Sequence, residues 1–374
     1  MPTQTLPFAN RLRRLAGALA AVDAEAAVIT PGPDLTYLLG HSVDSHERLS
    51  CLVLPAAGDA VLLVPELERL GWAGTSAEDT VPVATWLDGQ DPYRLVGDLL
   101  PAGLSRIAVA DSMPAVHALR IADAVPGSVL RLAGGAIAVL RVRKSAAEIV
   151  ALTGVGAAID RVQQRIGEWL RPGRTEFEVA ADIAAAILEE GHERPDFVIV
   201  GSGANGASPH HEASARVIRP GDAVVIDIGG PGAGELAGYF SDCTRTYQVA
   251  GDADPELAAV YEVVRQAQQA GVDAVRPGVT AESIDAAART VIEDAGYGPY
   301  FITRTGHGIG LEVHEEPYLV AGNAVVLEPG MTFSVEPGIY LPGRFGVRIE
   351  DIVAVTDDGV TRLNNCSRDF QVVP

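Results

Sequence analysis

The chain has 374 residues, of which 48% are hydrophobic and 21% are charged, enough apolar material for a packed core in each of two domains. Its 28 basic and 49 acidic residues leave a formal charge of −21, which disfavours binding to nucleic acid or to an anionic membrane surface. The three cysteines, Cys51, Cys243 and Cys366, are widely spaced and include no CxxC pair. They therefore predict neither a disulfide framework nor a thiolate zinc site, which is typical of a reducing compartment.

The first segment has two interpretations. A basic cluster at residues 11–14 followed by the apolar residues 15–22 has the outline of a short signal peptide. The same segment carries Leu12, Leu15 and Leu19 at helical spacing, which predicts an amphipathic helix with the arginines on its other face. We favour the helix. Because no apolar run approaches the roughly 18 residues that a membrane helix needs, we expect a cytoplasmic protein without a membrane partner.

Residues 1–143 read as a small α/β domain. Short runs rich in leucine or β-branched residues, separated by turns and helical stretches, predict strands at residues 26–30, 35–39, 49–54, 60–64 and 106–110. The segment contains no glycine-rich phosphate loop and no cluster of histidines or carboxylates. We assign no chemistry to it.

Residues 144–374 read as a second, α+β domain. It opens with Ser145 and Glu148 in a capping-box pattern. Helices are predicted at residues 145–171, 175–190, 255–274 and 281–295, and strands at 197–200, 223–228 and 244–249, before a strand-rich final third. Helix pairs followed by strands, twice over, suggest a duplicated unit around an antiparallel sheet.

This second part also holds most of the negative charge. Residues 146–374 contain 34 acidic and 16 basic side chains. Most of these acidic residues fit solvated helix faces, and a cation site stays open as a further explanation.

Two carboxylates interrupt strands that ought to be apolar. Asp227 lies inside the run Val224-Val-Ile-Asp-Ile, where an unpaired charge would cost several kcal/mol. Asp242 enters the next strand, and strand alternation places it on one face with Thr244 and Thr246. Each aspartate taken alone is more often satisfied by a neighbouring arginine or by backbone than by a metal ion.

Three further polar residues occupy similar positions downstream. His307 lies in Thr305-Gly-His-Gly-Ile-Gly310, Glu336 follows a predicted strand, and Glu350 shares a face with Arg348. A lone histidine among glycines is more often a turn or core residue, but five such departures in one domain shift the balance. Four carboxylates and one imidazole suit Mn²⁺, Co²⁺, Fe²⁺ or Zn²⁺, and two ions sharing bridging carboxylates would use all five residues.

These motifs resemble those of the pita-bread metallopeptidases, which include Xaa-Pro dipeptidase (prolidase), aminopeptidase P and methionine aminopeptidase. The resemblance rests on five segments in the same order and covers essentially the whole chain: Ile226-Asp-Ile-Gly, Ser241-Asp-Cys-Thr-Arg-Thr, Gly306-His-Gly-Ile-Gly-Leu-Glu-Val-His314, Val335-Glu-Pro-Gly-Ile-Tyr and Val347-Arg-Ile-Glu-Asp. It implies a C-terminal pita-bread (creatinase/aminopeptidase) fold over residues 144–374 and a creatinase-like N-terminal domain over residues 1–143.

The resemblance also implies a role for each candidate residue. By position, two metal ions, with Mn²⁺ preferred over Co²⁺, Zn²⁺ or Fe²⁺, bind to Asp227, Asp242, His307, Glu336 and Glu350, with Asp242 and Glu350 bridging. Glu336 is the expected proton shuttle. His210, selected over a solvated His211 by its spacing from Asp227, and His314 would donate hydrogen bonds to the substrate. Arg348 is expected to orient or balance Asp242 and Glu350, or to bind substrate.

The implied activity is hydrolysis of the peptide bond before proline by a metal-bridging hydroxide. We expect a homodimeric Xaa-Pro dipeptidase acting on small peptides with proline in second position. Aminopeptidase P, cleaving longer peptides, is the alternative. Creatinase, which works without metal, and a catalytically silent binding protein on the same fold are less favoured, since all five ligands are present.

The chain departs from the family pattern at two places. The hairpin between Asp227 and Asp242 is longer by a glycine-rich insertion near residues 231–234, which a surface loop tolerates cheaply. Some prolidases carry an arginine where this chain has Tyr318. If that arginine grips a dipeptide carboxylate, Arg344 or Arg348 would have to substitute for it.

Overall fold

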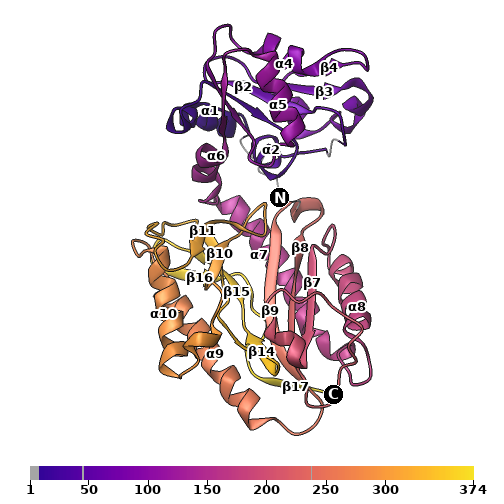
Figure 1. The fold of residues 1–374 in the computed structure, drawn as a ribbon, viewed down its shortest axis with the longest axis vertical. Coiled ribbons are helices and arrows are strands. Elements are labelled where there is room, and N and C mark those ends of the chain that lie inside the picture. Colours follow the sequence, from indigo (N-terminus) through magenta and orange to yellow (C-terminus); the bar gives the residue numbers. More distant parts are fainter. Residues whose placement is uncertain (1–7, 44–45, 237) are drawn as a thin grey trace. The chain divides into compact units, whose positions relative to one another are not determined.

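The computed structural model describes residues 8–43, 46–236 and 238–374 (Figure 1). The chain folds into two compact units, Met1–Arg141 and Val142–Pro374, and the fold class is the predicted α+β. Within the described residues, no helix has the length and apolarity to cross a membrane.

In the part of the first unit that the structure describes, one six-stranded sheet has the order β4-β3-β2-β1-β5-β6, with β1 antiparallel to β2 and parallel to β5. Its strands are β1 (Ala26–Ile29), β2 (Cys51–Pro55), β3 (Val61–Pro65), β4 (Val83–Trp86), β5 (Arg106–Val109) and β6 (Val129–Leu132). Its helices are α1 (Phe8–Ala18), α2 (Pro33–Leu39), α3 (Ser76–Thr80), α4 (Pro92–Leu99), α5 (Ala115–Ala124) and α6 (Gly134–Arg141).

Several predictions for this unit were wrong. The strand predicted at residues 35–39 is helix α2: Pro33 occupies its first turn, where the missing N–H costs nothing, and Gly40 ends it in the left-handed conformation at φ 71°. A short apolar run buried on all sides does not distinguish a strand from a helix. Strands β4 and β6 were missed.

The amphipathic first helix is confirmed as α1, but its arginines do not share one exposed face. Arg11 is buried at 5% exposure and donates to the carbonyl of Tyr37 at 2.6 Å. Its guanidinium carbon also lies 4.1 Å from the centroid of the Tyr37 ring, so a charged side chain is accommodated in the core by a hydrogen bond and a cation–π contact.

Over its described residues, the second unit contains three sheets rather than the single antiparallel sheet that was predicted. Their orders are β17-β9-β8-β7, β11-β10-β12-β15-β16 and β13-β14, and β17 runs parallel to β9. The strands are β7 (Phe197–Ser202), β8 (Ala223–Pro231), β9 (Phe240–Val249), β10 (Gly306–Gly308), β11 (Glu315–Leu319), β12 (Thr332–Val335), β13 (Gly338–Leu341), β14 (Phe345–Arg348), β15 (Asp351–Val355), β16 (Val360–Arg362) and β17 (Gln371–Val373). The helices are α7 (Ala146–Gln164), α8 (Glu176–Glu189), α9 (Pro255–Ala274) and α10 (Ala281–Asp294).

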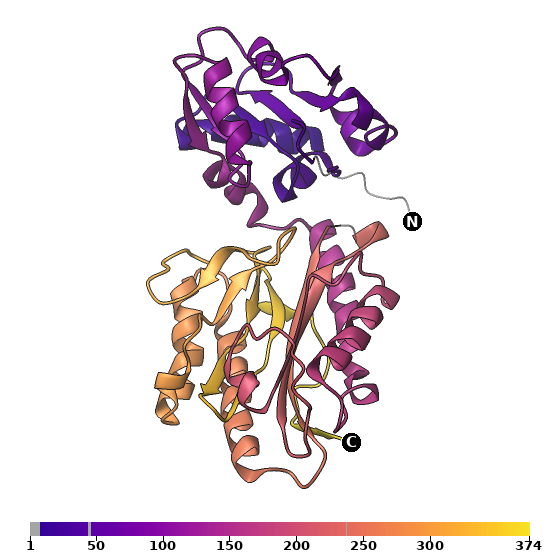
Figure 2. The ribbon, with the colours of Figure 1, turned by 45° about the vertical axis from the view of Figure 1, so that its right-hand side comes forward.

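These helices cover the outer faces of the sheets (Figures 1 and 2). Buried residues of α7 and α8, including Ile159 and Ile183, share a core with β7, β8 and β9. Residues of α9 and α10, including Val264 and Ile284, pack on the strands of the final third. The faces of the two strand layers that these helices leave uncovered are therefore turned toward each other.

Local signals at the start of the unit behave as the sequence predicts. Ser145 and Glu148 form the capping box that opens α7. Beside it, Lys144 is buried at 7% exposure, donates its backbone N–H to the carbonyl of Gly330 and pairs its ammonium with Glu315. The first residues of the unit are thus tied to its last third.

Candidate metal centre

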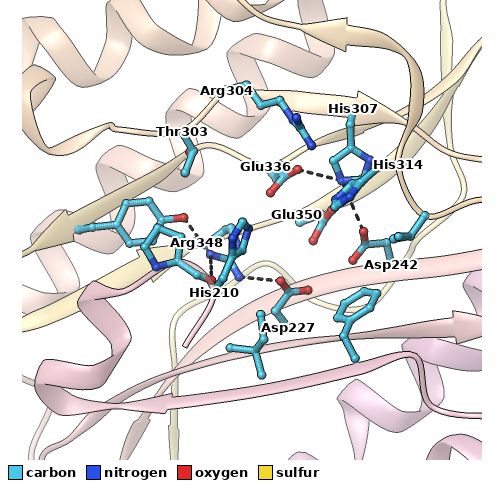
Figure 3. Close-up of a pocket in the computed structure, with 15 residues that line it drawn as sticks. His210, Asp227, Asp242, Thr303, Arg304, His307, His314, Glu336, Arg348 and Glu350 are labelled. Atoms are coloured by element: carbon cyan, nitrogen blue, oxygen red, sulfur yellow. Dashed lines mark hydrogen bonds and ion pairs between the residues drawn. The ribbon is translucent and has the colours of Figure 1, made fainter. Parts of the chain in front are cut away.

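A pocket of about 460 Å³ lies among the strands of the second unit (Figure 3). Its walls come from β7, β8, β9, β10, β13 and β14 and from the loops beside them. All eight residues singled out in the sequence line it: His210, Asp227, Asp242, His307, His314, Glu336, Arg348 and Glu350. The structure therefore brings together side chains spread over 140 residues of chain.

The two aspartates are placed by the register of one hairpin. In the β8–β9 pair, Asp227 lies opposite Thr244 and Gly229 opposite Asp242. Because side chains two residues apart share a face, Asp227, Asp242 and Thr244 all point to the same side of the sheet. The longer hairpin adds its extra residues beyond the pair Pro231–Phe240, so the insertion leaves this register intact.

His307 is held by close backbone packing. A Cβ at Gly306 would stand 2.0 Å from the carbonyl oxygen of Ser334, and a Cβ at Gly308 would stand 2.2 Å from that of Glu316. Only glycine on both sides of His307 therefore allows β10 to fit between β11 and β12. The Nδ1 atom lies 3.1 Å from the carbonyl oxygen of Gly308. Since a carbonyl only accepts, Nδ1 donates its N–H to that oxygen, and Nε2 is the ring nitrogen that faces the pocket.

The remaining carboxylates converge on that nitrogen. The Nε2 atom of His307 lies 3.1 Å from Oε1 of Glu336 and 3.6 Å from Oδ2 of Asp242. Glu350 receives a hydrogen bond from the Thr244 hydroxyl at 2.7 Å on Oε2. Ligand atoms of Asp242, His307 and Glu350 all lie within 4.8 Å of one another.

Burial makes this concentration of charge costly. Asp242 and Glu350 are 4% and 1% exposed. Burial, followed by the neighbouring carboxylates, raises the pKa of both groups well above the usual range. Burial alone would also raise the pKa of Glu336, but its hydrogen bond to His307 and the charge there hold that pKa below the ordinary value.

Three buried oxygens in this cluster fit a cation. Within the described part of the chain, Oδ1 of Asp227, Oδ1 of Asp242 and Oε1 of Glu350 have no hydrogen-bond partner. A buried carboxylate oxygen without a donor loses its hydration without compensation. Hard oxygens together with one imidazole are the ligands that divalent first-row metals accept, so the residues fit the metal site that the sequence predicts.

The hydrogen-bond partners of Arg348 differ from those that were predicted. Its Nη2 donates to Oδ2 of Asp227 at 2.6 Å, and its Nε donates to Thr244. Nη1 donates to the carbonyl of Pro209 and to the hydroxyl of Tyr340. The ion pair therefore orients Asp227, which was not predicted, while the positive charge of Arg348 opposes the rise in the pKa of Asp242 and Glu350, as its predicted balancing role requires. The other donors of Arg348 are already engaged by protein oxygens.

The prediction of a solvated His211 was wrong. Its Nε2 lies 2.9 Å from Oε2 of Glu176, whereas the neighbouring His210 is exposed and lines the pocket. Adjacent histidines thus have separate environments. One faces the pocket, and the other anchors the loop that carries it.

Glu176 is the centre of that anchor and was missed in the sequence. It is fully buried, and it accepts hydrogen bonds from the backbone and side chains of Ser202 and Ser214, from Asn205 and from His211. Burial acts to raise its pKa, but the bonds from Ser202, Ser214 and His211 outweigh burial and lower the pKa. A glutamate in the first turn of a helix reads as ordinary helix charge, so only the folded chain reveals this role.

We expect Glu176→Gln to destabilise the protein. An amide N–H₂ would face a backbone N–H of Ser202 or Ser214 and the NH₂ of Asn205, which can only donate, and this mismatch should cost about 1 to 3 kcal/mol of the free energy of unfolding. Urea denaturation measures this loss, and limited proteolysis should show cleavage in the segment 203–214. Glu189→Gln, at an exposed position of the same helix, is the matched control, with a change within about 0.5 kcal/mol. A Glu176→Gln protein as stable as the control would contradict the role given to this network.

His314 completes the polar wall of the pocket. Its ring packs edge-on against His307 with centroids 4.2 Å apart. Burial, with the nearby positive charges of His307 and Arg304, lowers its pKa to about 4. His314 is therefore neutral near pH 7 and offers one N–H donor.

Arg344 was one of two arginines predicted to take over the role of an arginine at position 318, and its position rules it out. Arg344 is 50% exposed and pairs with Glu256 on helix α9, and it does not line the pocket. The pocket wall instead includes Arg304, which the sequence did not single out (Figure 3).

Comparison with known proteins places these features in a family. Sequence models match at residues 151–357 (Metallopeptidase family M24) and at residues 11–143 (Creatinase/Prolidase N-terminal domain). The chain is 53% identical over 368 residues to the probable dipeptidase PepE of Mycobacterium tuberculosis, covering 98% of this chain and 97% of that protein. It is 36% identical over 362 residues to the Xaa-Pro dipeptidase of Lactobacillus helveticus, covering 94% and 95%. The crystal structure of a recombinant prolidase from Thermococcus sibiricus superposes with a TM-score of 0.90 at 38% identity, covering 98% of this chain and all of that one.

Proposed function

The chain belongs to metallopeptidase family M24, and from this premise we propose that it is a metal-dependent Xaa-Pro dipeptidase, which cleaves the bond before proline in a dipeptide. The observation that carries the proposal is the convergence of three unpartnered, buried carboxylate oxygens with His307 in one pocket. Its volume lies within the range of pockets that hold small ligands. The similarity to the Xaa-Pro dipeptidase of L. helveticus and to the prolidase of T. sibiricus supports proline as the second residue.

We assign Asp227, Asp242, His307, Glu336 and Glu350 as the residues that would hold two divalent cations, with Mn²⁺ as the resident ion. When bound, such cations supply Lewis acidity, which polarises the scissile carbonyl and lowers the pKa of water toward neutrality. Thr244 and Arg348 orient Glu350 and Asp227 through the hydrogen bonds described above. These residues fix the donor set before any ligand arrives.

Glu336 is the proposed proton carrier. Its lowered pKa keeps it ionised near pH 7, so it can accept the proton of the attacking water. The Ser334 hydroxyl donates to Oε1 of Glu336 at 3.0 Å and limits its rotation. The amide nitrogen before proline carries no hydrogen, so cleavage requires delivery of a proton to that nitrogen, and Glu336 returns the one it holds.

His210 and His314 act on the substrate carbonyls. Neutral His314 presents a single donor within the pocket, and His210 projects from the loop anchored by Glu176. Donors aimed at an oxygen that gains negative charge stabilise the transition state more than the ground state. We assign Arg348 to positioning, because its donors already contact the protein.

Residues 144–374 form the proposed catalytic domain, and the match to the M24 family lies wholly inside that range. The homodimer implied by the family resemblance and the cytoplasmic location predicted from the sequence stay predictions.

Substrate length tests the proposal. We expect kcat/KM for Ala-Pro to exceed that for Ala-Pro-Ala by about 10-fold or more, since one good contact to a charged end group is worth at least that factor. Steady-state kinetics with Mn²⁺-loaded enzyme measure the ratio, with Ala-Leu as the control for the proline requirement. Faster cleavage of the tripeptide would instead identify an aminopeptidase.

A further inference from the structure

One cation in the pocket has no carboxylate to neutralise it. Arg304 lines the wall beside Val313 and His314 and is partly exposed. Among the described residues it forms no ion pair, whereas Arg348, the other arginine of the pocket, is paired with Asp227. Figure 3 shows the Arg304 side chain extending into the same space as the carboxylate cluster. Its guanidinium therefore offers a positive site to whatever enters.

The guanidinium is held in place by an aromatic ring. Its central carbon lies 4.6 Å from the centroid of the Tyr318 ring, which is within the range of a cation–π contact. Stacking uses the flat face of the guanidinium and leaves the N–H edges available. Some relatives carry an arginine at the position of Tyr318. In this chain the tyrosine at that position instead supports the positive charge of Arg304, which comes from the segment before β10.

The backbone around Arg304 is also fixed. Buried Asp285 accepts hydrogen bonds from both the N–H and the hydroxyl of Thr305. Arg289, which pairs with Asp285, donates to the carbonyls of Phe301 and Thr303. The segment before His307 is thus clamped to helix α10. A ligand bound by Arg304 would meet a preorganised donor rather than a mobile surface arginine.

We propose that Arg304 binds the free C-terminal carboxylate of the substrate and thereby restricts the enzyme to dipeptides. This inference rests on the proposed function and names the recognition element of the same site. A substrate carboxylate entering beside Asp227, Asp242, Glu336 and Glu350 needs a cation that is not already paired with one of them. A guanidinium also matches a carboxylate with two parallel N–H donors, which a lysine cannot.

The test compares two substrates that differ only at the end group, Ala-Pro and Ala-Pro amide. The wild-type enzyme should favour the carboxylate by about 10- to 100-fold in kcat/KM, and Arg304→Gln should reduce this preference by at least about 10-fold, mainly through KM. Arg304→Lys should fall between them. The matched control is Arg344→Gln, which removes an equal charge from the exposed pair with Glu256 and should keep the wild-type preference.

Two further measurements keep the outcomes distinct. The first is calorimetric binding of Ala-Pro to the metal-loaded protein in every variant. The second uses Tyr318→Leu, which keeps the charge of Arg304 but removes the ring that supports it. This variant should weaken binding of Ala-Pro, and it replaces Arg304→Gln if that protein does not fold. Equal losses on both substrates, or a wild-type enzyme indifferent to the end group, would overturn the role of Arg304. Absence of any Xaa-Pro hydrolysis, with binding still dependent on Arg304, would instead overturn the proposed function.

Discussion

Glu336→Gln should lower kcat by about 10²- to 10⁴-fold, the range that a general acid–base group supplies. The substitution keeps the size of the side chain but removes the group whose lowered pKa makes it a proton acceptor. Steady-state kinetics at saturating Ala-Pro measure kcat, circular dichroism reports the fold, and the metal content of the purified protein separates loss of the proton carrier from loss of a ligand.

The matched control for this substitution is Glu328→Gln. Glu328 is 50% exposed and pairs with Arg143 away from the pocket, so its loss should leave kcat unchanged. A Glu336→Gln enzyme with its metal bound and a kcat near that of the wild type would show that another group moves the proton.

Removal of metal should abolish hydrolysis, and addition of Mn²⁺ or Co²⁺ should restore it. The same ions should also stabilise the fold, because they bind carboxylates that are otherwise buried together. At a free ion concentration of 100 times the Kd, the gain is about 2.7 kcal/mol in the free energy of unfolding. Thermal unfolding with and without Mn²⁺ measures it independently of activity. In Asp242→Asn, which removes one ligand charge, the added ion should shift the midpoint less.

The raised pKa values of Asp242 and Glu350 add a dependence on pH. In metal-free protein the folded state holds protons that the unfolded state has released above its ordinary carboxyl pKa. The free energy of unfolding should therefore fall as pH rises from that value through the raised pKa of the folded state. Bound cations should remove this slope.

Full activity in metal-free protein would exclude the proposed metal site, and creatine hydrolysis by that form would favour a creatinase.

The site residues that could be predicted from the sequence are those that interrupt a strong local pattern. Asp227 stands out in an apolar strand and His307 stands out among glycines, and the structure places both in one pocket. Helix α9 was predicted with its bounds, Pro255–Ala274, because Asp254 and Pro255 give a clear start signal.

The residues that were missed depend on distant parts of the chain. Glu176 meets donors that lie 26 to 38 residues away, and Arg304 is significant only because Arg348, the other arginine that lines the pocket, is paired with Asp227. Neither property appears in a local window. Likewise the partner of Arg348 follows from how β14 lies against the β8–β9 hairpin, which the order of motifs does not specify.

The buried pair of Lys144 and Glu315 limits how the predicted homodimer can be detected. Lys144 is the chain's one lysine, and its ammonium is shielded within its own subunit. Reagents that couple ε-amines on neighbouring subunits therefore have no accessible target of that kind, and a negative result with them would carry no information. Carbodiimide coupling through surface carboxylates, or light scattering, will report the assembly instead.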